Sequence, residues 1–293
     1  MKLLAALSVV LPVLVLSGRP TTAQPSASPA APRRIISLVP ATTEMLYAIG
    51  AGSRMVGVGT YDRYPPDVEK LPRLGGLLDP NIEQLIALKP DLVIVYDTQA
   101  ELKRQLQRAK IAFWAYSIRD LTDVTATLRG LGSRVGMAPA STAAATEIEM
   151  RLQRVRTRVS GRPRPKTLLI FGREAGTLRG INASGGYGFL HDLLELAGGD
   201  DVLADVKQAA VSMSTEMVLA RAPEVIIELH YGEPWPAARI DSERRVWSAL
   251  PSVPAVRTGR ITLLAGDEFV VPGPRVTLAA ERLADILHPA PSR

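Results

Sequence analysis

Residues 81–96 read NIEQLIALKPDLVIVY, and residues 214–229 read STEMVLARAPEVIIEL. The two stretches correspond position by position: a helix-capping residue, a glutamate two places on, an apolar helical face, an Ala-x-x-Pro-acid turn and an apolar run. Asn81 and Ser214 carry side-chain oxygens that accept the amide hydrogens of a first helical turn. A unit of helix, turn and strand that occurs twice predicts a chain of two similar α/β lobes.

The same two stretches indicate how each copy packs. Pro90 and Pro223 end the helices, because proline has no amide hydrogen and disfavours helical geometry in the residue before it. The strands that follow are apolar without alternation, which is typical of parallel sheets covered on both faces. The helical stripe that we expect to be buried consists of Leu85, Ile86, Leu88, Val218 and Leu219.

Length and composition favour an exported protein of two domains. The chain has 293 residues, 46% of them hydrophobic, which is enough for two cores. Residues 1–23 resemble a cleavable secretory signal, with Lys2 before an apolar run that is too short for a confident membrane span. The chain has no cysteine, so it can form no disulfide and carries no lipid-attachment cysteine. The predicted parts are a signal peptide (1–23), a disordered leader (24–33), an N-terminal α/β lobe (34–138), a connecting helix (139–160) and a C-terminal α/β lobe (161–288).

Charge and motif content argue against several other functions. The net charge of +6 falls to +4 once Lys2 and Arg19 leave with the signal, and the arginines are dispersed, so we expect no nucleic-acid binding. The chain lacks Gly-x-Ser-x-Gly, His-Glu-x-x-His and phosphate-binding-loop motifs, so we expect no catalytic residues. Its three histidines are far apart in sequence, a poor match to a zinc or manganese site.

Several loops follow predicted strands, where open α/β sheets bind ligands. The turn at residues 40–42 and the loop at 59–66 follow strands of the first lobe. In the second lobe, residues 173–188 are expected to form a long loop, His230 directly follows a strand, and residues 267–275 precede the last helix.

Four motifs in order resemble the periplasmic-binding-protein family for iron chelates, haem and vitamin B12, and most closely its vitamin B12-binding members. They read ISLVPATTE at 36–44, VGVGTYDRYPP at 56–66, NIE with KPDLVI within 81–94, and PGPR at 272–275. The resemblance implies two Rossmann-like lobes with parallel sheets, joined by one long helix, with the ligand held between them. It also implies a soluble, monomeric periplasmic protein that delivers its ligand to an ABC importer in the inner membrane.

The resemblance further implies a role for two glutamates. In vitamin B12-binding relatives, a glutamate on the outer surface of each lobe pairs with arginines of the permease, and the matching residues here are Glu83 and Glu216. The alternative is that each is only an acid in the first turn of a helix, stabilised by the helix dipole.

The expected ligand is cobalamin, with no separate cofactor. Tyr61 of the matching Tyr-x-x-Tyr-Pro-Pro motif would offer a stacking surface for a flat macrocycle, unless it is an ordinary loop tyrosine. The sequence departs from the relatives in having Leu77 and Ala210 where they place tryptophans. The residues expected to contact ligand are Ala41, Thr42, Tyr61, Arg173, Tyr187, His230, Asp267, Glu268, Phe269, Val270 and Val271.

Haem and ferric siderophores remain alternative ligands. An axial iron contact could come from Tyr61, Tyr187, His191, His230 or Tyr231, although His191 fits a packed or solvated helix position and His288 a structural one. A siderophore would instead use Arg173, Arg179 or Arg275 to meet its anionic groups.

Overall fold

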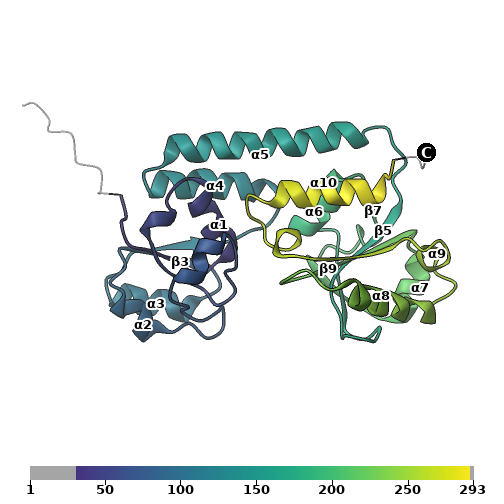
Figure 1. Ribbon diagram of the computed structural model, residues 1–293, viewed down its shortest axis with the longest axis horizontal. Helices are drawn as coiled ribbons and strands as arrows, with labels where there is room; N and C mark the ends of the chain where they lie inside the picture. The colour runs from purple at the N-terminus through teal and green to yellow at the C-terminus, as the bar shows by residue number, and fades with distance from the viewer. Residues whose placement is uncertain (1–30, 291–293) are drawn as a thin grey trace, which may run out of the picture. The chain divides into compact units, whose positions relative to one another are not determined.

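The computed structural model describes residues 31–290, which form two β-sheets and the helices that cover them (Figure 1). The first sheet has the strand order β2-β1-β3-β4, with every pairing parallel. The second has the order β10-β9-β5-β6-β8, with β7 also paired to β5. The strands of the first sheet are β1 Ile35–Ser37, β2 Met55–Val58, β3 Leu92–Tyr96 and β4 Phe113–Tyr116; those of the second are β5 Lys166–Gly172, β6 Ile181–Ser184, β7 Asp200–Asp201, β8 Ala210–Met213, β9 Val225–His230 and β10 Ile261–Ala265.

The second sheet is mixed, so the prediction of parallel sheets in both lobes is wrong for this lobe. Strand β6 runs antiparallel to β5 and β8, whereas β7, β9 and β10 join the sheet in parallel. Strand β6 also lies inside residues 173–188, where the sequence predicts a loop. Its four residues, Ile-Asn-Ala-Ser, include a single large apolar side chain, so they produce no apolar run for a strand prediction to detect.

The duplicated unit folds as its capping residues predict. Helix α2 (Ile82–Ala87) begins after Asn81, whose side chain accepts the amide hydrogen of Gln84 at 3.0 Å. Helix α7 (Thr215–Arg221) begins after Ser214, whose hydroxyl accepts the amide hydrogen of Met217 at 3.3 Å. Both helices therefore start at the predicted N-cap, and each leads into a central strand of its sheet, β3 or β9.

Part of the predicted buried stripe on these helices is exposed. Leu85 and Val218 are fully buried, but Ile86 is 44% exposed and Leu219 is 41% exposed. Each exposed residue directly follows the buried one, so it lies about 100° further round the helix. A helix of six or seven residues contacts its sheet through only a narrow strip of side chains, so the residue after the buried one faces solvent.

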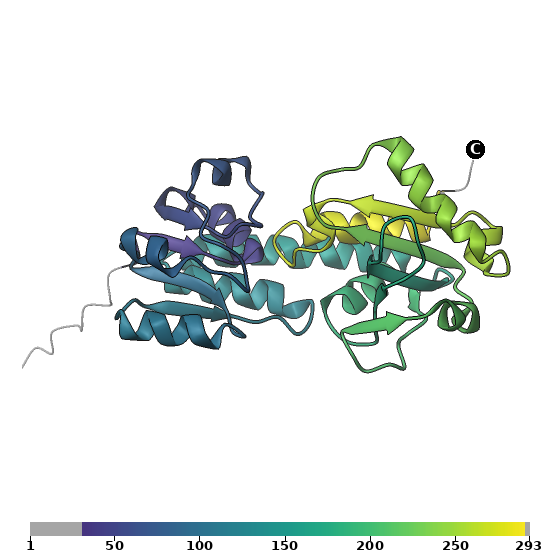
Figure 2. The same ribbon diagram turned by 90° about the horizontal axis from the view of Figure 1, so that it is seen from below.

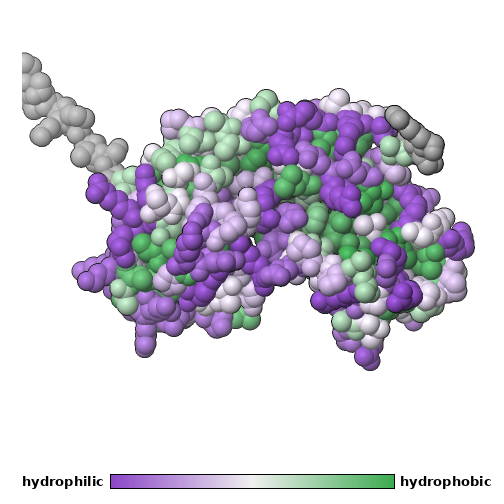
Figure 3. Space-filling model, in the orientation of Figure 1, coloured by the Kyte–Doolittle hydropathy of each residue, from purple (hydrophilic) through white to green (hydrophobic). Residues whose placement is uncertain are grey.

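Helix α5 (Ala138–Val159) connects the two sheets. Its buried residues include Ile148, Leu152, Val155 and Val159, the face predicted from their spacing. Helices α4 (Thr122–Arg134) and α10 (Val276–Leu287) pack against it, one from each lobe, as Figures 1 and 2 show. In Figure 3 the surface over α5 changes from apolar near its start to hydrophilic near its arginine-rich end.

The remaining helices cover the faces of the sheets, and one apolar core continues through both lobes. That core includes Leu46 of the first lobe, Ile148 of α5 and Leu283 of α10. Within residues 31–290, no helix is both long enough and apolar enough to span a membrane. The other α-helices are α1 Pro40–Ala48, α3 Ala100–Arg108, α6 Phe189–Leu196, α8 Ala237–Arg245 and α9 Pro254–Arg257; 3-10 turns occupy Gly52–Arg54, Pro66–Lys70, Val246–Ala249 and Asp267–Phe269.

Candidate functional site

A cleft between the lobes contains a cavity of about 610 Å³. Every strand of the first sheet contributes to its wall at the carboxyl end, as expected for an open α/β sheet. The contributing residues are Ala41 after β1, Tyr61 after β2, Tyr96 at the end of β3 and Tyr116 at the end of β4.

The second lobe closes the cavity from the other side. Phe171 of β5, Tyr231 after β9, and Val270 and Val271 after β10 come from its strand ends. Phe189, at the start of α6, adds a further aromatic ring. Both lobes therefore offer aromatic and aliphatic surface to a molecule bound between them.

The lining is uncharged. Of the fifteen described residues that form it, none is charged, none is histidine and four are tyrosines. Tyr96 and Tyr116 meet edge to face, with ring centroids 6.0 Å apart and planes at 71°. Tyr61 and Tyr231 form a similar pair across the lobes at 6.2 Å and 79°, and the Tyr231 hydroxyl donates to the carbonyl oxygen of Tyr61.

Burial raises the pKa values of three of these tyrosines. It raises the pKa of Tyr96 to about 12 and that of Tyr231 to about 12, and it raises the pKa of Tyr116 as well. Desolvation disfavours the charged phenolate, so these side chains are uncharged at physiological pH.

Among the predicted ligand contacts, the structure brings Ala41, Tyr61, Val270 and Val271 together in the cavity wall. Thr42, next to Ala41, is fully buried behind the wall. Its hydroxyl lies 2.8 Å from that of Ser37 and donates to the carbonyl oxygen of Val39 at 3.0 Å, so it holds the turn between β1 and α1.

The acidic part of the loop at residues 267–271 supports the cavity from outside its wall. Asp267 accepts the amide hydrogen of Gly232 at 2.9 Å, which fixes the loop that carries Tyr231. Glu268 pairs with Arg275 at 3.0 Å, and Phe269 packs against the main core. These three residues are not among those that line the cavity.

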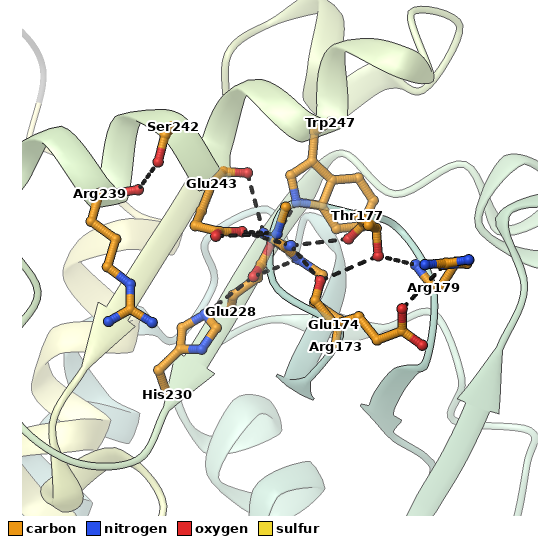
Figure 4. Close-up of polar contacts among 11 residues, drawn as sticks. Arg173, Glu174, Thr177, Arg179, Glu228, His230, Arg239, Ser242, Glu243 and Trp247 are labelled. Carbon is orange, nitrogen blue, oxygen red and sulfur yellow. Dashed lines mark hydrogen bonds and ion pairs between the residues drawn. The ribbon is translucent and has the colours of Figure 1, made fainter.

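Arg173 is enclosed within the second lobe rather than placed in the cavity wall (Figure 4). Its side chain is 1% exposed and pairs with Glu228 at 3.0 Å and Glu243 at 2.8 Å. The guanidinium also donates to the carbonyl oxygens of Glu174 and Thr177, at 3.3 and 3.0 Å. Its hydrogen-bond donors are therefore occupied by partners within the protein, as expected for a buried arginine.

His230 and Tyr187 also lie apart from the cavity wall. The Nε2 atom of His230 is 3.2 Å from Oε2 of Glu228, as Figure 4 shows, and its ring lies 4.0 Å from that of Trp235. Trp247 donates its indole hydrogen to the same Glu228 carboxylate. Tyr187 is 49% exposed, and its backbone amide donates to Gly185 within a glycine-rich loop.

His191 and Arg179, two other residues considered for haem or siderophore contact, have partners of their own. His191 lies 2.8 Å from the buried carboxylate of Asp201, in agreement with a packed helix position. Exposed Arg179 pairs with Glu174 at 3.1 Å. His288 caps the end of α10, in agreement with a structural role.

Arg275 links the two lobes beside the cavity. It donates to the Glu44 carboxylate in α1 at 2.6 and 3.1 Å, and its guanidinium carbon lies 4.1 Å from the ring centroid of Tyr64. Glu44 is only 4% exposed, and burial raises the pKa of its carboxyl despite the nearby guanidinium. The pair joins elements 231 positions apart, so separation of the lobes would expose and break it.

Glu83 and Glu216 are exposed in the first turns of α2 and α7. Within residues 31–290, neither carboxylate takes part in an ion pair with another side chain. The Ser214 hydroxyl holds the pKa of Glu216 below its usual value. Both acids are thus available to an external cation at equivalent positions of the repeat.

The prediction from sequence missed Tyr96, Tyr116, Phe171 and Phe189 as cavity residues. The first three share a signal that was available: each is an aromatic residue at or next to the carboxyl end of an apolar run. Leu77, noted as a replacement for tryptophan, does line the cavity, whereas Ala210 does not.

A second hollow of about 790 Å³ has the opposite chemistry. It lies among α4, α5 and α6, and its wall includes Glu149, Glu195 and Arg156. Glu149 pairs with Arg129 at 2.6 Å, and Glu195 pairs with Arg164. Residues 31–290 also contain no group of three or more acidic or histidine side chains placed to hold a metal ion.

Two α/β lobes with an aromatic cavity between them define a ligand-binding protein. The chain belongs to the periplasmic binding protein family, whose sequence profile matches residues 35–267. It is 29% identical to a vitamin B12-binding protein of Pectobacterium carotovorum over 89% of this chain and 91% of the relative, and 27% identical to one of Yersinia pestis over 89% of each. Both relatives are binding proteins, which favours a non-catalytic role.

Solved structures show the same fold. The periplasmic vitamin B12 binding protein of Vibrio cholerae is 25% identical, with a TM-score of 0.75 over 88% of this chain and 98% of that one. A periplasmic haem-binding protein of Pseudomonas aeruginosa has a TM-score of 0.76 at 24% identity, covering 88% and 94% of the two chains. The predicted signal peptide and most of the predicted leader lie outside the described residues.

Proposed function

We propose that this protein binds cobalamin in the cleft between its lobes, in the periplasm, and delivers it as a monomer to an ABC importer of the inner membrane. The proposal assigns residues 34–138 and 161–288 to the two lobes and residues 139–160 to the helix between them. Ala41, Tyr61, Val270 and Val271 would contact the ligand directly, while Thr42 and residues 267–269 hold the surrounding turns.

The observation that carries this proposal is the uncharged, tyrosine-rich cavity wall. Haem carries two propionate carboxylates and ferric siderophores carry anionic chelating groups, which call for a cation in the site. Arg173 and Arg275 are already paired with glutamates. The periphery of cobalamin instead carries neutral carboxamides, which suit tyrosine hydroxyls, and the flat face of its ring suits aromatic side chains.

The test is a calorimetric titration of residues 24–293 with cyanocobalamin and, separately, with haemin, accompanied by visible absorbance spectra. We expect one cyanocobalamin per chain and no stoichiometric haem spectrum. Saturable haemin binding without cobalamin binding would refute the proposed ligand. Tyr61→Ala should weaken cobalamin binding, because it removes an aromatic ring from the cavity wall at a residue that is 57% exposed.

Delivery to the importer is proposed to use Glu83 and Glu216. They occupy equivalent places in the repeat, are exposed, and have no side-chain ion pair within the described residues. Replacing both with alanine should leave cobalamin affinity unchanged and reduce uptake in cells that depend on this protein. Glu69→Ala combined with Glu147→Ala changes the net charge equally and serves as the control. Undiminished uptake in the first double variant would refute the docking role.

A further inference from the structure

Each of the two repeated helices carries a large apolar side chain beside its exposed glutamate. Ile86 follows Glu83 by one helical turn in α2, and Leu219 follows Glu216 in the same way in α7. Side chains at this spacing are neighbours on one face of a helix. Ile86 is 44% exposed and Leu219 is 41% exposed. We call these two combinations, Glu83 with Ile86 and Glu216 with Leu219, the acid–apolar pairs.

The backbone presents the two pairs in the same way. Lys89 after α2 and Ala222 after α7 occupy equivalent positions of the repeat, and both have a left-handed backbone with φ of 47°. Residues other than glycine seldom adopt that conformation, so its recurrence indicates that the two units end alike. Figure 1 shows α2 and α7 on the side of the sheets that faces away from α5. A partner on that side would meet one pair on each lobe.

The fold itself does not require an aliphatic side chain at either position. Leu85 and Val218 bury the inner faces of the two helices. Among the described residues, Ile86 and Leu219 are not part of the apolar cores or of the side chains packed against them. A single exposed apolar residue is ordinary on a protein surface. The same neighbour, spacing and exposure on both lobes instead indicate a shared use.

The chemistry of the pairs limits what can cover them. An apolar recess would take the aliphatic side chain, and a cationic side chain beside that recess would pair with the carboxylate. An anionic lipid surface would repel the glutamates. Two copies of this chain joined through the same face would bring acid against acid. A protein partner that carries cations next to apolar recesses fits both components of each pair.

We propose that Ile86 and Leu219 are apolar anchors of the surface that docks on the importer, each entering an apolar recess of the permease beside the cation that pairs with its glutamate. This inference rests on the proposed function and adds an apolar component to a surface defined so far by two charges. Burial of an aliphatic side chain stabilises a complex, whereas an exposed ion pair contributes little. The aliphatic side chains would therefore supply affinity, and the glutamates would orient the complex.

The test measures saturable binding of the purified protein, without cyanocobalamin, to right-side-out membrane vesicles from cells that make it and its importer. The variant combines Ile86→Gln with Leu219→Gln, which keeps the net charge and suits a helix. We expect its dissociation constant for the vesicles to rise about ten-fold or more, because two apolar contacts are lost. Its melting temperature and its affinity for cyanocobalamin should stay unchanged, because both positions are exposed and lie outside the cavity wall.

The matched control combines Met150→Gln with Leu278→Gln. These residues are 47% and 44% exposed and lie on α5 and α10, away from α2 and α7 in Figure 1. The control should bind the vesicles as the wild type does. An equal loss of binding in the control would overturn the inference, because it would show a general effect of lost surface hydrophobicity.

The outcomes separate this inference from the proposed function. If Glu83→Ala with Glu216→Ala weakens vesicle binding and the glutamine variant does not, the inference is wrong and the proposed docking role stands. If only the glutamine variant weakens it, the apolar anchors are supported and the proposed role of the glutamates fails. Wild-type binding to protein-free liposomes, or self-association that the glutamine variant abolishes, would overturn the inference in favour of a lipid surface or a second copy. A wild type that does not bind the vesicles would refute both the inference and the proposed delivery.

Discussion

Asp62, next to Tyr61 in the loop after β2, should make the stability of the protein depend on pH. It is 1% exposed, and neither carboxyl oxygen has a hydrogen-bond partner within the described residues. Burial raises its pKa from 3.8 to about 7, and the nearby Thr43 hydroxyl and Arg73 guanidinium oppose this only in part. The folded protein therefore keeps this proton over a pH range in which the unfolded chain has lost it.

The sign and size of the effect follow from proton linkage. Between pH 3.8 and about 7 the folded state binds more protons at this site than the unfolded state, so stability falls as pH rises and levels off above about 7. A difference of about three between the folded and unfolded pKa values corresponds to about 4 kcal/mol over the whole range. Between about pH 4.5 and about pH 8 the expected loss is about 3 kcal/mol.

The assay compares the wild type with Asp62→Asn, whose amide is neutral at every pH used. Urea unfolding is followed by the fluorescence of Trp114, which lies in β4 of the same lobe, with Trp235 and Trp247 reporting the other lobe. All other ionisable groups are shared, so the difference between the two pH profiles isolates Asp62. We expect the Asp62→Asn variant to gain about 3 kcal/mol on the wild type as pH rises from about 4.5 to about 8. Parallel profiles would refute the assignment of a buried, protonated Asp62.

Three further predictions test contacts within the fold. Arg275→Met should lower the free energy of unfolding by roughly 3 kcal/mol or more, because it leaves Glu44 buried without its partner. Combining it with Glu44→Gln should restore part of that loss, which thermal melts would measure. Arg173→Met should reduce soluble yield and lower the melting temperature, because it leaves two carboxylates in the interior; a normal melting temperature would contradict the observed pairing. Asn81→Ala and Ser214→Ala should each cost about 1 kcal/mol in urea unfolding, and no cost would show that these caps contribute little.

The sequence predicted the features of the fold that depend on local patterns. The caps at Asn81 and Ser214 and the buried face of α5 follow from residue type and spacing alone. Strand β6 could not be predicted from residue type and spacing, because four residues with one large apolar side chain acquire strand geometry only by pairing with β5 and β8. Ile86 and Leu219 were misjudged because the width of contact between a short helix and its sheet is set by tertiary packing.

The position of the candidate site was predictable from the sequence, but several of the residues that line it were not. Strand ends were expected to converge, and Ala41, Tyr61, Val270 and Val271 do. Arg173 could not be excluded from the sequence, because its partners lie 55 and 70 positions away in Glu228 and Glu243. Charged residues near a strand end face either a ligand or the interior, and only the folded chain distinguishes the two.

The arrangement around Arg173 also constrains how the sequence can change during evolution. One guanidinium pairs with both Glu228 and Glu243, so replacing the arginine alone leaves two buried carboxylates without a partner. Exchanging all three residues for apolar residues of similar volume, in contrast, costs little stability. Intermediates with one or two of the changes would be selected against. Aligned relatives should therefore keep this trio or lose it together, and Trp247 should covary with Glu228, which accepts its indole hydrogen.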